Sequence, residues 1–329
     1  MKCKICNTKT YLFIGGIFDD RHGYPGRFDI YRCPQCDFYS THPEPTGPEL
    51  DRLYTDFYPR KGLSPDQVQA MVTPLASLKD RLSVWAKGNH NTCHFYSKPG
   101  MRVLDYGCGV GVSLIEINNL GAEAFGIEVD ENVGPIAEAL NLKIHIGSLE
   151  SMPYPDHYFD LITLNQVIEH IPDPVQFLKA LKAKLKQDGK IMLSFPNANS
   201  LTRKMFGRRW LHWHVPYHLN HFSKKSTEFL LKQAGLRVTS IKTVTPNLWT
   251  MLQFRSLLAS VEEGERNTSW DLAGAGNERQ KAEHNVVDWL ILRTINFLSS
   301  RGKLMLLLNN RLIDILGRGD SFVVEACID

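Results

Sequence analysis

Apolar residues between positions 99 and 245 occur in short runs that are separated by longer stretches with helical spacing. The runs predict strands at 102–106, 124–127, 143–146, 159–164 and 190–195. The clearest helical pattern lies between them at 175–185. Strands that alternate with helices are typical of βαβ units, so the pattern predicts an α/β fold with a parallel sheet.

The chain on either side of this region has other patterns. Residues 43–65 are rich in Pro and Gly and predict a linker or a wrapping arm, and residues 66–98 have apolar positions at helical spacing. The block 246–319 looks mostly helical, with apolar segments at 286–298 and 304–316. The chain closes with a strand pattern at 321–328, so we expect a helical insertion before the last strand.

Composition narrows the class of protein. A length of 329 residues suggests about two domains, and 43% apolar with 22% charged residues is ordinary for a soluble globular protein. The net charge of +3 is too small to imply a nucleic-acid partner. An odd number of cysteines, seven, argues against a secreted disulfide scaffold. No stretch resembles a signal peptide or a membrane span, so we expect a reducing, cytoplasmic location.

The strongest chemical signal follows the strand that ends at Asp105, where Gly107, Gly109 and Gly111 precede a helical pattern. Glycine suits a sharp turn that a ligand touches, and a helix N-terminus offers free N–H groups. The third glycine comes one residue early for a dinucleotide site, and the chain has no P-loop triplet. The pattern instead resembles motif I of the class I S-adenosylmethionine (SAM) methyltransferases; the alternative is a turn without a ligand.

Two downstream segments strengthen the resemblance. Glu128 ends the second strand, about 20 residues after the turn, where a carboxylate can accept hydrogen bonds from ribose hydroxyls. Asp130 is the second candidate, although it suits the N-cap of the next helix. The segment 165–174 resembles the family's sequence after its fourth strand. The resemblance covers roughly residues 99–197.

The family resemblance implies SAM as the cofactor. The residues that it places at the cofactor are Asp105, Gly107, Gly109, Gly111, Glu128, Ser148, Leu149 and Asn165. Many members have Asp at the position of Ser148.

Methyl transfer from a sulfonium needs an aligned nucleophile, and it needs a base when the nucleophile carries a proton. His170 follows the fourth strand and is the first candidate base; its alternative role is a helix cap or a buried polar residue. In some quinone-type O-methyltransferases, acidic residues and a His in this segment use a divalent metal. Gln166 stands where a Glu often sits, which argues against a metal here.

A loop after the fifth strand, residues 210–223, contains four histidines and four large aromatic residues. We expect it to form a wall of the acceptor site for a flat or sugar-like molecule, with His218 or His221 as base. A zinc site is the less favoured interpretation, because no acidic or Cys partner is adjacent. The segment 218–223 resembles a His-x-x-His-Phe-Ser-like stretch in a subgroup of these enzymes.

Four of the seven cysteines form two pairs, Cys3 with Cys6 and Cys33 with Cys36. A Cys-x-x-Cys turn aims two thiolates at one ion, and two such turns complete a tetrahedral zinc site. We therefore predict structural zinc, with a redox or disulfide role as the alternative. Some members of the family carry such a zinc module, among them sugar methyltransferases. The segment 53–59 resembles one that often follows the module, and it forms either a lid over the cofactor or an aromatic staple.

The sequence thus predicts a Rossmann-like, mostly parallel seven-stranded sheet with helices on both faces. The expected units are a zinc ribbon (1–42), an arm and helix (43–98), a methyltransferase core (99–245 with 320–329) and a helical insertion or substrate cap (246–319). The segment 286–316 roofs the site, contacts a membrane surface peripherally or forms a homodimer face. We expect methyl transfer to an oxygen of a sugar, glycan or quinone-like ring. The alternatives are a non-catalytic SAM-binding interaction module and an RNA methyltransferase, although the Asn/Asp-Pro-Pro-Tyr/Phe motif of base-amine enzymes is missing.

Overall fold

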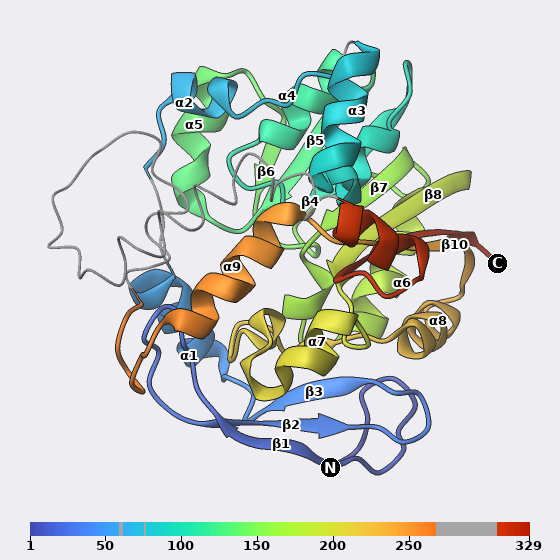
Figure 1. The fold of residues 1–329 in the computed structure, drawn as a ribbon. Coiled ribbons are helices and arrows are strands. Elements are labelled where there is room, and N and C mark those ends of the chain that lie inside the picture. The colour runs from blue at the N-terminus through green and yellow to red at the C-terminus, as the bar shows by residue number, and fades with distance from the viewer. Residues whose placement is uncertain (59–61, 76, 268–307) are drawn as a thin grey trace, which may run out of the picture.

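The computed structural model describes residues 1–58, 62–75, 77–267 and 308–329, and a seven-stranded sheet lies at its centre (Figure 1). The sheet has the order β10-β11-β8-β7-β4-β5-β6. Its strands are β4 (Arg102–Tyr106), β5 (Glu123–Glu128), β6 (Ile144–Ile146), β7 (Phe159–Asn165), β8 (Leu185–Pro196), β10 (Leu236–Val244) and β11 (Ser321–Ile328). Every strand expected from the apolar runs is present, so the predicted fold class is confirmed.

The direction of the strands also agrees with the prediction. β4 pairs in parallel with β5 and β7, and β7 pairs in parallel with β8. The last strand, β11, lies between β10 and β8 and is antiparallel to both. The carboxyl ends of the parallel strands therefore meet at one edge, which is where open α/β sheets bind their ligands.

Helices cover both faces of this sheet (Figure 1). On one face, α6 (Pro174–Lys184) and α8 (Lys224–Gln233) bury leucines such as Leu181 and Leu230 in the larger core cluster. On the other face, α4 (Val112–Asn119) buries Leu114 and Ile117 against β4 and β7. α5 (Gly134–Ala139) follows a 3-10 turn, η4 (Glu131–Val133), that Asp130 caps.

The N-terminal cysteine module is a small antiparallel sheet of β1 (Tyr11–Ile17), β2 (Phe28–Arg32) and β3 (Tyr39–His42). A short strand from the central part of the chain, β9 (Asn220–His221), adds to β3 as its fourth strand. In this pairing Tyr39 lies opposite His221. The module is thus joined by backbone pairing to the loop expected to form the acceptor site.

The arm and the helix expected over 43–98 are broken into short pieces. These are α1 (Gly47–Arg52), the π-helix η1 (Leu53–Phe57), α2 (Pro65–Ala70), α3 (Leu78–Lys87), η2 (Asn89–Asn91) and η3 (Cys93–Tyr96). Pro74, which lacks a backbone N–H, interrupts the helical spacing, and Ser77 then caps α3 through a capping box with Asp80. The apolar stripe on α3 is exposed rather than buried, with Leu78 74% and Leu82 55% exposed.

The described part of the region before the last strand combines helices with turns and coil at 259–267 and 316–320. It contains α9 (Asn247–Leu258) and a helix over 308–315. The expected segment 286–298 and residues 304–307 of the second segment lie outside the described residues. No described helix is both long and apolar enough to cross a membrane.

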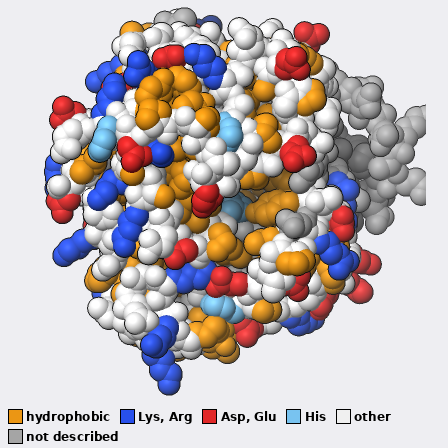
Figure 2. Space-filling view, turned by 180° about the vertical axis from the view of Figure 1, so that it is seen from behind, with side chains coloured by type: hydrophobic (Ala, Val, Ile, Leu, Met, Phe, Trp, Pro, Cys, Tyr) orange, Lys and Arg blue, Asp and Glu red, His pale blue; other side chains and the backbone are white. Residues whose placement is uncertain are grey.

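The remaining short helices lie near the carboxyl edge of the sheet. They are η5 (Ile168–His170), α7 (Leu201–Phe206), η6 (Gly207–Arg209) and η7 (Leu211–Trp213). On the reverse face of the molecule, charged side chains of both signs are interspersed around exposed hydrophobic ones (Figure 2). This mixture agrees with the small net charge of the chain.

Candidate functional site

The glycine-rich turn connects β4 to α4, and all three glycines have positive φ angles. A Cβ at Gly111 would lie 2.5 Å from Leu142 Cδ1, and one at Gly107 would lie 2.8 Å from Val167 Cγ2. A Cβ at Gly109 would meet no atom within 4 Å. Gly107 and Gly111 are therefore needed for packing, whereas Gly109 faces open space in which a ligand can approach the backbone.

Glu128 lies at the end of β5, beside this turn. Its Oε2 accepts a hydrogen bond from the backbone N–H of Gly109 at 2.9 Å, and its Oε1 accepts from Val129 N at 2.8 Å. The carboxylate is therefore fixed against the open glycine by its own strand end and by the turn. This arrangement fits a nucleoside cofactor whose ribose hydroxyls donate to a carboxylate.

Asp105 and Asn165 belong to a buried network beneath the turn. Asp105 Oδ1 accepts from Thr163 Oγ1 at 2.6 Å and from Asn165 Nδ2 at 3.2 Å. Asn165 Oδ1 in turn accepts from Cys93 N at 2.7 Å. Both side chains are thus occupied in holding β4, β7 and η3 together, which is the arrangement expected of residues that position a binding loop.

The loop after β6 contains the two remaining candidates for the cofactor, Ser148 and Leu149. Ser148 is exposed, and its backbone N–H donates to Ser151 Oγ at 3.1 Å. Leu149 is buried in the larger core cluster. The structure therefore brings the Ser148 hydroxyl to the surface and places Leu149 in the wall behind it.

The segment after β7 lies directly against the glycine turn, because Val167 is the residue that crowds Gly107. Gln166 precedes it with a φ of 56°, which is uncommon for a residue other than glycine. Its side-chain amide donates to Ser194 Oγ at 3.1 Å. Backbone strain of this kind is frequent at functional sites, and here it turns the chain into η5.

Glu169 is a buried carboxylate in η5, and its side chain was missed in the sequence analysis. It is 1% exposed, and neither of its oxygens has a hydrogen-bond partner among the other described residues. Burial raises the pKa of this carboxyl to about 8. The available signal was a single Glu placed between apolar residues, in the run Val167-Ile168-Glu169-His170-Ile171.

Two of the three predicted histidines lie beside Glu169. One ligand atom each from Glu169, His170 and His218 lie within 4.8 Å of one another. His170 Nδ1 lies 2.9 Å from Tyr217 O, and His218 Nδ1 lies 2.9 Å from His212 O. Because a carbonyl can only accept, both Nδ1 atoms carry the hydrogen, and each Nε2 keeps a lone pair. Burial lowers the pKa of His170 to about 4, so this ring is neutral at neutral pH.

The third predicted histidine, His221, has a different environment. Its Nε2 lies 3.0 Å from Thr41 Oγ1, and the same hydroxyl donates to His218 O at 2.6 Å. Since the Thr41 hydroxyl donates its hydrogen to the carbonyl, His221 Nε2 must donate to the hydroxyl oxygen. His221 therefore connects the cysteine module to the acceptor loop, and its lone pair at Nδ1 is buried without a described partner.

Aromatic rings from three separate parts of the chain surround His170. Tyr54 OH lies 3.1 Å from His170 Nδ1, and the Tyr54 ring packs edge-on against Tyr217 at 5.8 Å. His22, from the loop between β1 and β2, packs against Tyr58 at 5.3 Å and against Tyr217 at 5.2 Å. The arm and the module thus form one wall of the site. The sequence analysis did not predict that His22 would be part of this wall.

The four cysteines of the module converge. All four sulfur atoms lie within 4.8 Å of one another, and Cys3–Cys36 and Cys6–Cys33 are 3.5 and 3.4 Å apart. Zinc–sulfur bonds of about 2.3 Å in a tetrahedron place sulfur atoms about 3.8 Å apart. The cluster has the size and the donor set of a four-cysteine metal site. The other cysteines, Cys93, Cys108 and Cys327, are not part of it.

Comparison with known proteins agrees with this geometry. Residues 78–241, about half of the chain, match the family model described as "Methyltransferase domain". A ubiquinone biosynthesis O-methyltransferase of Ruegeria sp. is 31% identical over 164 residues, which are 46% of this chain and 66% of that protein. The enzyme of the same description from Cereibacter sphaeroides is 29% identical over 149 residues, 42% of this chain and 60% of that protein.

The matches leave part of each relative uncovered, because this chain spans less than two thirds of the length of these curated relatives. Among solved structures, a SAM dependent methyltransferase from Archaeoglobus fulgidus is 22% identical, with a TM-score of 0.43. The match covers 75% of this chain and 94% of that one. The region that matches the family model, residues 78–241, does not include the cysteine module.

Proposed function

We propose that this protein, whose residues 78–241 form a methyltransferase domain, transfers a methyl group from SAM to an oxygen of a small molecule. We further infer that the acceptor is a flat ring with a hydroxyl group, of the quinol type. The observation that carries the proposal is the buried Glu169 carboxylate, which lies two residues after the Val167 that packs on the glycine turn and has no hydrogen-bond partner among the described side chains.

In this proposal the turn and the end of β5 hold the cofactor. The backbone at Gly109 lies against it, Glu128 accepts from the ribose, and Asp105 with Asn165 keeps the turn in place. Ser148 and Leu149 contact the adenine. When bound, SAM supplies an activated methyl group on a positively charged sulfur.

Residues of the chain then accept the proton of the acceptor hydroxyl. As the acceptor oxygen attacks the methyl carbon, its hydrogen passes to the ionised Glu169 carboxylate, and the carbon–sulfur bond breaks. Glu169 is the stronger proton acceptor of the pair, because burial raises its pKa to about 8 and lowers that of His170 to about 4. His170 and His218 orient the hydroxyl through Nε2, and their Nδ1 hydrogens are held by carbonyl groups.

The aromatic wall supports a flat acceptor. Tyr54, Tyr58 and Tyr217 form a contiguous set of rings next to His170, and such rings offer faces on which a planar molecule can stack. The names of the two relatives favour the same class of acceptor.

We also propose that the four cysteines, Cys3, Cys6, Cys33 and Cys36, hold one structural zinc ion. The ion would reinforce the small core of the module, since about 40 residues alone bury too little apolar surface to be stable. Through the pairing of β3 with β9, it would also support the acceptor loop. The units expected from the sequence, including a cap at 246–319, stay part of this proposal.

The test is a methyl-transfer assay with labelled SAM and a matched pair of acceptors. A catechol- or quinol-type ring should be methylated on oxygen, whereas a sugar nucleotide should not. Methylation of the sugar nucleotide alone would overturn the acceptor class and leave the enzyme class intact. No transfer to either acceptor or to fractionated cell extract, from a protein that still binds SAM, would favour the non-catalytic alternative.

A further inference from the structure

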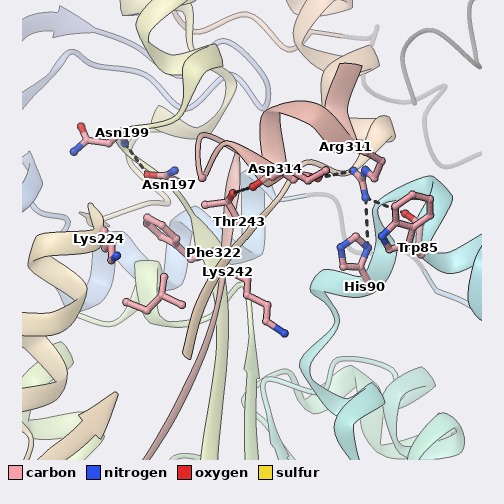
Figure 3. Close-up of a pocket in the computed structure, with 13 residues that line it drawn as sticks. Trp85, His90, Asn197, Asn199, Lys224, Lys242, Thr243, Arg311, Asp314 and Phe322 are labelled. Atoms are coloured by element: carbon pink, nitrogen blue, oxygen red, sulfur yellow. Dashed lines mark hydrogen bonds and ion pairs between the residues drawn. The ribbon is translucent and has the colours of Figure 1, made fainter. Parts of the chain in front are cut away.

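A cavity lies at the β10 end of the sheet, away from the glycine turn. Its volume is about 490 Å³, within the range of small-molecule sites. It is formed where the end of β10 and the start of β11 meet α3, η2, α8 and the helix over 308–315 (Figure 3). β8 and β11 separate it from β7 and from the catalytic segment that follows β7.

The lining of this cavity is rich in cations. Lys242 and Arg311 lie near His90 on one face of the sheet, Lys224 begins α8 on the other face, and Asp314 is the carboxylate among the lining residues. Asp314 is already engaged, since its Oδ2 lies 3.0 Å from Arg311 Nη2 and its Oδ1 accepts from Thr245 at 2.7 Å. Neither lysine forms an ion pair or a hydrogen bond with any residue that the structure describes. The cavity therefore has positive charge that its own walls do not neutralise.

Arg311 has a buried N–H group that lacks a hydrogen-bond acceptor among the described residues. It is 4% exposed, and its Nη1 donates to Trp85 O at 2.9 Å on the far wall (Figure 3). Its Nε is buried and has no acceptor in the described part of the chain. A buried N–H of a charged group without an acceptor is costly, and an oxyanion in the cavity would provide one.

The pKa of His90 is also affected by these positive charges. Burial, followed by the charges of Arg311 and Lys242, lowers the pKa of this imidazole to about 4. His90 is thus a neutral wall residue at neutral pH. The effect on His90 indicates that the positive charges of Arg311 and Lys242 extend into the cavity.

Part of the cavity lining is apolar. Trp85 and Phe322 lie in its walls, and Trp85 is 48% exposed. Exposed apolar residues continue from Trp85 along two neighbouring helices, with Leu82 on α3 and with Leu312 and Ile315 on the helix over 308–315. A ligand that carries its charge at one end and apolar groups at the other would match this division.

We propose that this cavity binds the phosphate of a small amphipathic molecule. The phosphate lies between Lys242 and Arg311, the two cations that act on His90, and the apolar part lies along Trp85. A phosphate suits the site because Lys binds it as a point charge and the Nε of Arg311 has a hydrogen to donate. The same chemistry is present in a soluble phosphate ester and in the headgroup of an anionic lipid. The proposal does not depend on methyl transfer, because the cavity is separate from the catalytic segment.

Binding measurements with the full chain can test the site without a methyl acceptor. The soluble probe is inorganic pyrophosphate, followed by calorimetry at constant ionic strength. The lipid probe is phosphatidylglycerol in phosphatidylcholine vesicles, followed by co-flotation. The test protein is Lys242→Gln. Its matched control is Lys232→Gln, which removes the same charge from an exposed position of α8 outside the cavity.

We expect the native chain to bind at least one probe saturably, Lys242→Gln to bind it at least tenfold more weakly, and the control to stay within twofold of native. Binding of pyrophosphate alone identifies a soluble phosphate ester as the ligand class, and binding of vesicles alone identifies a lipid headgroup. The proposal is overturned if the native chain binds neither probe. It is overturned equally if Lys242→Gln and the control bind alike.

Discussion

The hydroxyl of Thr41 lies 3.0 Å from Nε2 of His221, although 180 residues separate them in the chain. Thr41 belongs to β3 of the cysteine module, and His221 belongs to β9, which adds to that module from the central part of the chain. The same hydroxyl donates to the carbonyl of His218, next to Glu169. The module and the acceptor loop are therefore one hydrogen-bonded unit.

Thr41→Val tests this unit while it keeps the size of the side chain. The change removes two buried hydrogen bonds, so the free energy of unfolding should fall by about 1–3 kcal/mol. Turnover should fall as well, and SAM affinity should stay close to native. Urea unfolding, turnover with labelled SAM and SAM calorimetry measure the three quantities. Ser40→Ala is the control, because the Ser40 hydroxyl contacts only His42, within the module, among described residues; an equal effect of both changes would contradict the role of Thr41.

Cys33→Ser should remove the metal from the module. We expect about one zinc per chain in the native protein and none in the variant, because three ligands rarely hold a structural zinc. The melting temperature should fall with the metal content. Elemental analysis and a thermal scan measure both. Cys327→Ser, a change in β11 outside the cluster, should keep the zinc, and a metal-free native protein would contradict the site.

Gly109→Ala should separate cofactor binding from folding. A Cβ at this position meets no atom of the described chain, so the cost in folding free energy is the roughly 1–2 kcal/mol of a positive φ. The methyl group would occupy the space on the cofactor side of the turn, and SAM affinity should fall at least tenfold. Gly100→Ala is matched in φ and in open surroundings but lies outside the turn. If both variants bind SAM equally, the turn is not the cofactor site.

Glu128→Ala should weaken SAM binding by about 1–3 kcal/mol, the range for loss of hydrogen bonds to a charged group. The variant also loses the contact with Gly109 N, so calorimetry should be accompanied by a melting temperature. Glu131→Ala removes an exposed carboxylate in the next turn and should leave the affinity unchanged. Unchanged affinity in Glu128→Ala would rule out the ribose assignment.

Glu169→Gln should abolish most turnover, by a factor of roughly 100 to 10,000, with SAM affinity retained. For the native protein, kcat/KM should rise with pH and level off above about 8, because the base must be ionised and its pKa is about 8. Glu138→Gln, at an exposed position of α5, is the control. Native activity that is independent of pH between 6 and 9, and a fully active Glu169→Gln, would each reject Glu169 as the base.

The same carboxyl should affect stability with a defined sign. In the folded chain Glu169 keeps its proton up to about pH 8, whereas the unfolded chain loses it near pH 4.3. The folded state therefore binds more protons in between, and the free energy of unfolding falls as pH rises from about 4.3 to about 8. Glu169→Gln should lack this contribution. Urea unfolding at pH 5 and pH 8 should show a larger decline for the native protein, and identical declines would contradict the raised pKa.

The sequence by itself determined the sheet and the glycine turn. Both depend on local signals: apolar runs such as 102–106, and glycines where the backbone has positive φ at Gly107, Gly109 and Gly111. The Cys-x-x-Cys spacing likewise predicted which four residues converge, because each pair is brought together by a single tight turn. Such features need few distant contacts, so they can be read along the chain.

Only the tertiary structure decided the environment of the titratable groups. Glu169 and His170 are neighbours in sequence, yet burial moves their pKa values in opposite directions, because it penalises the charged form of each. His221 resembled His218 in the sequence, but it lies opposite Tyr39 of β3 and donates to Thr41. These differences arise from contacts between segments 47 to 180 residues apart in the chain, and no local pattern records them.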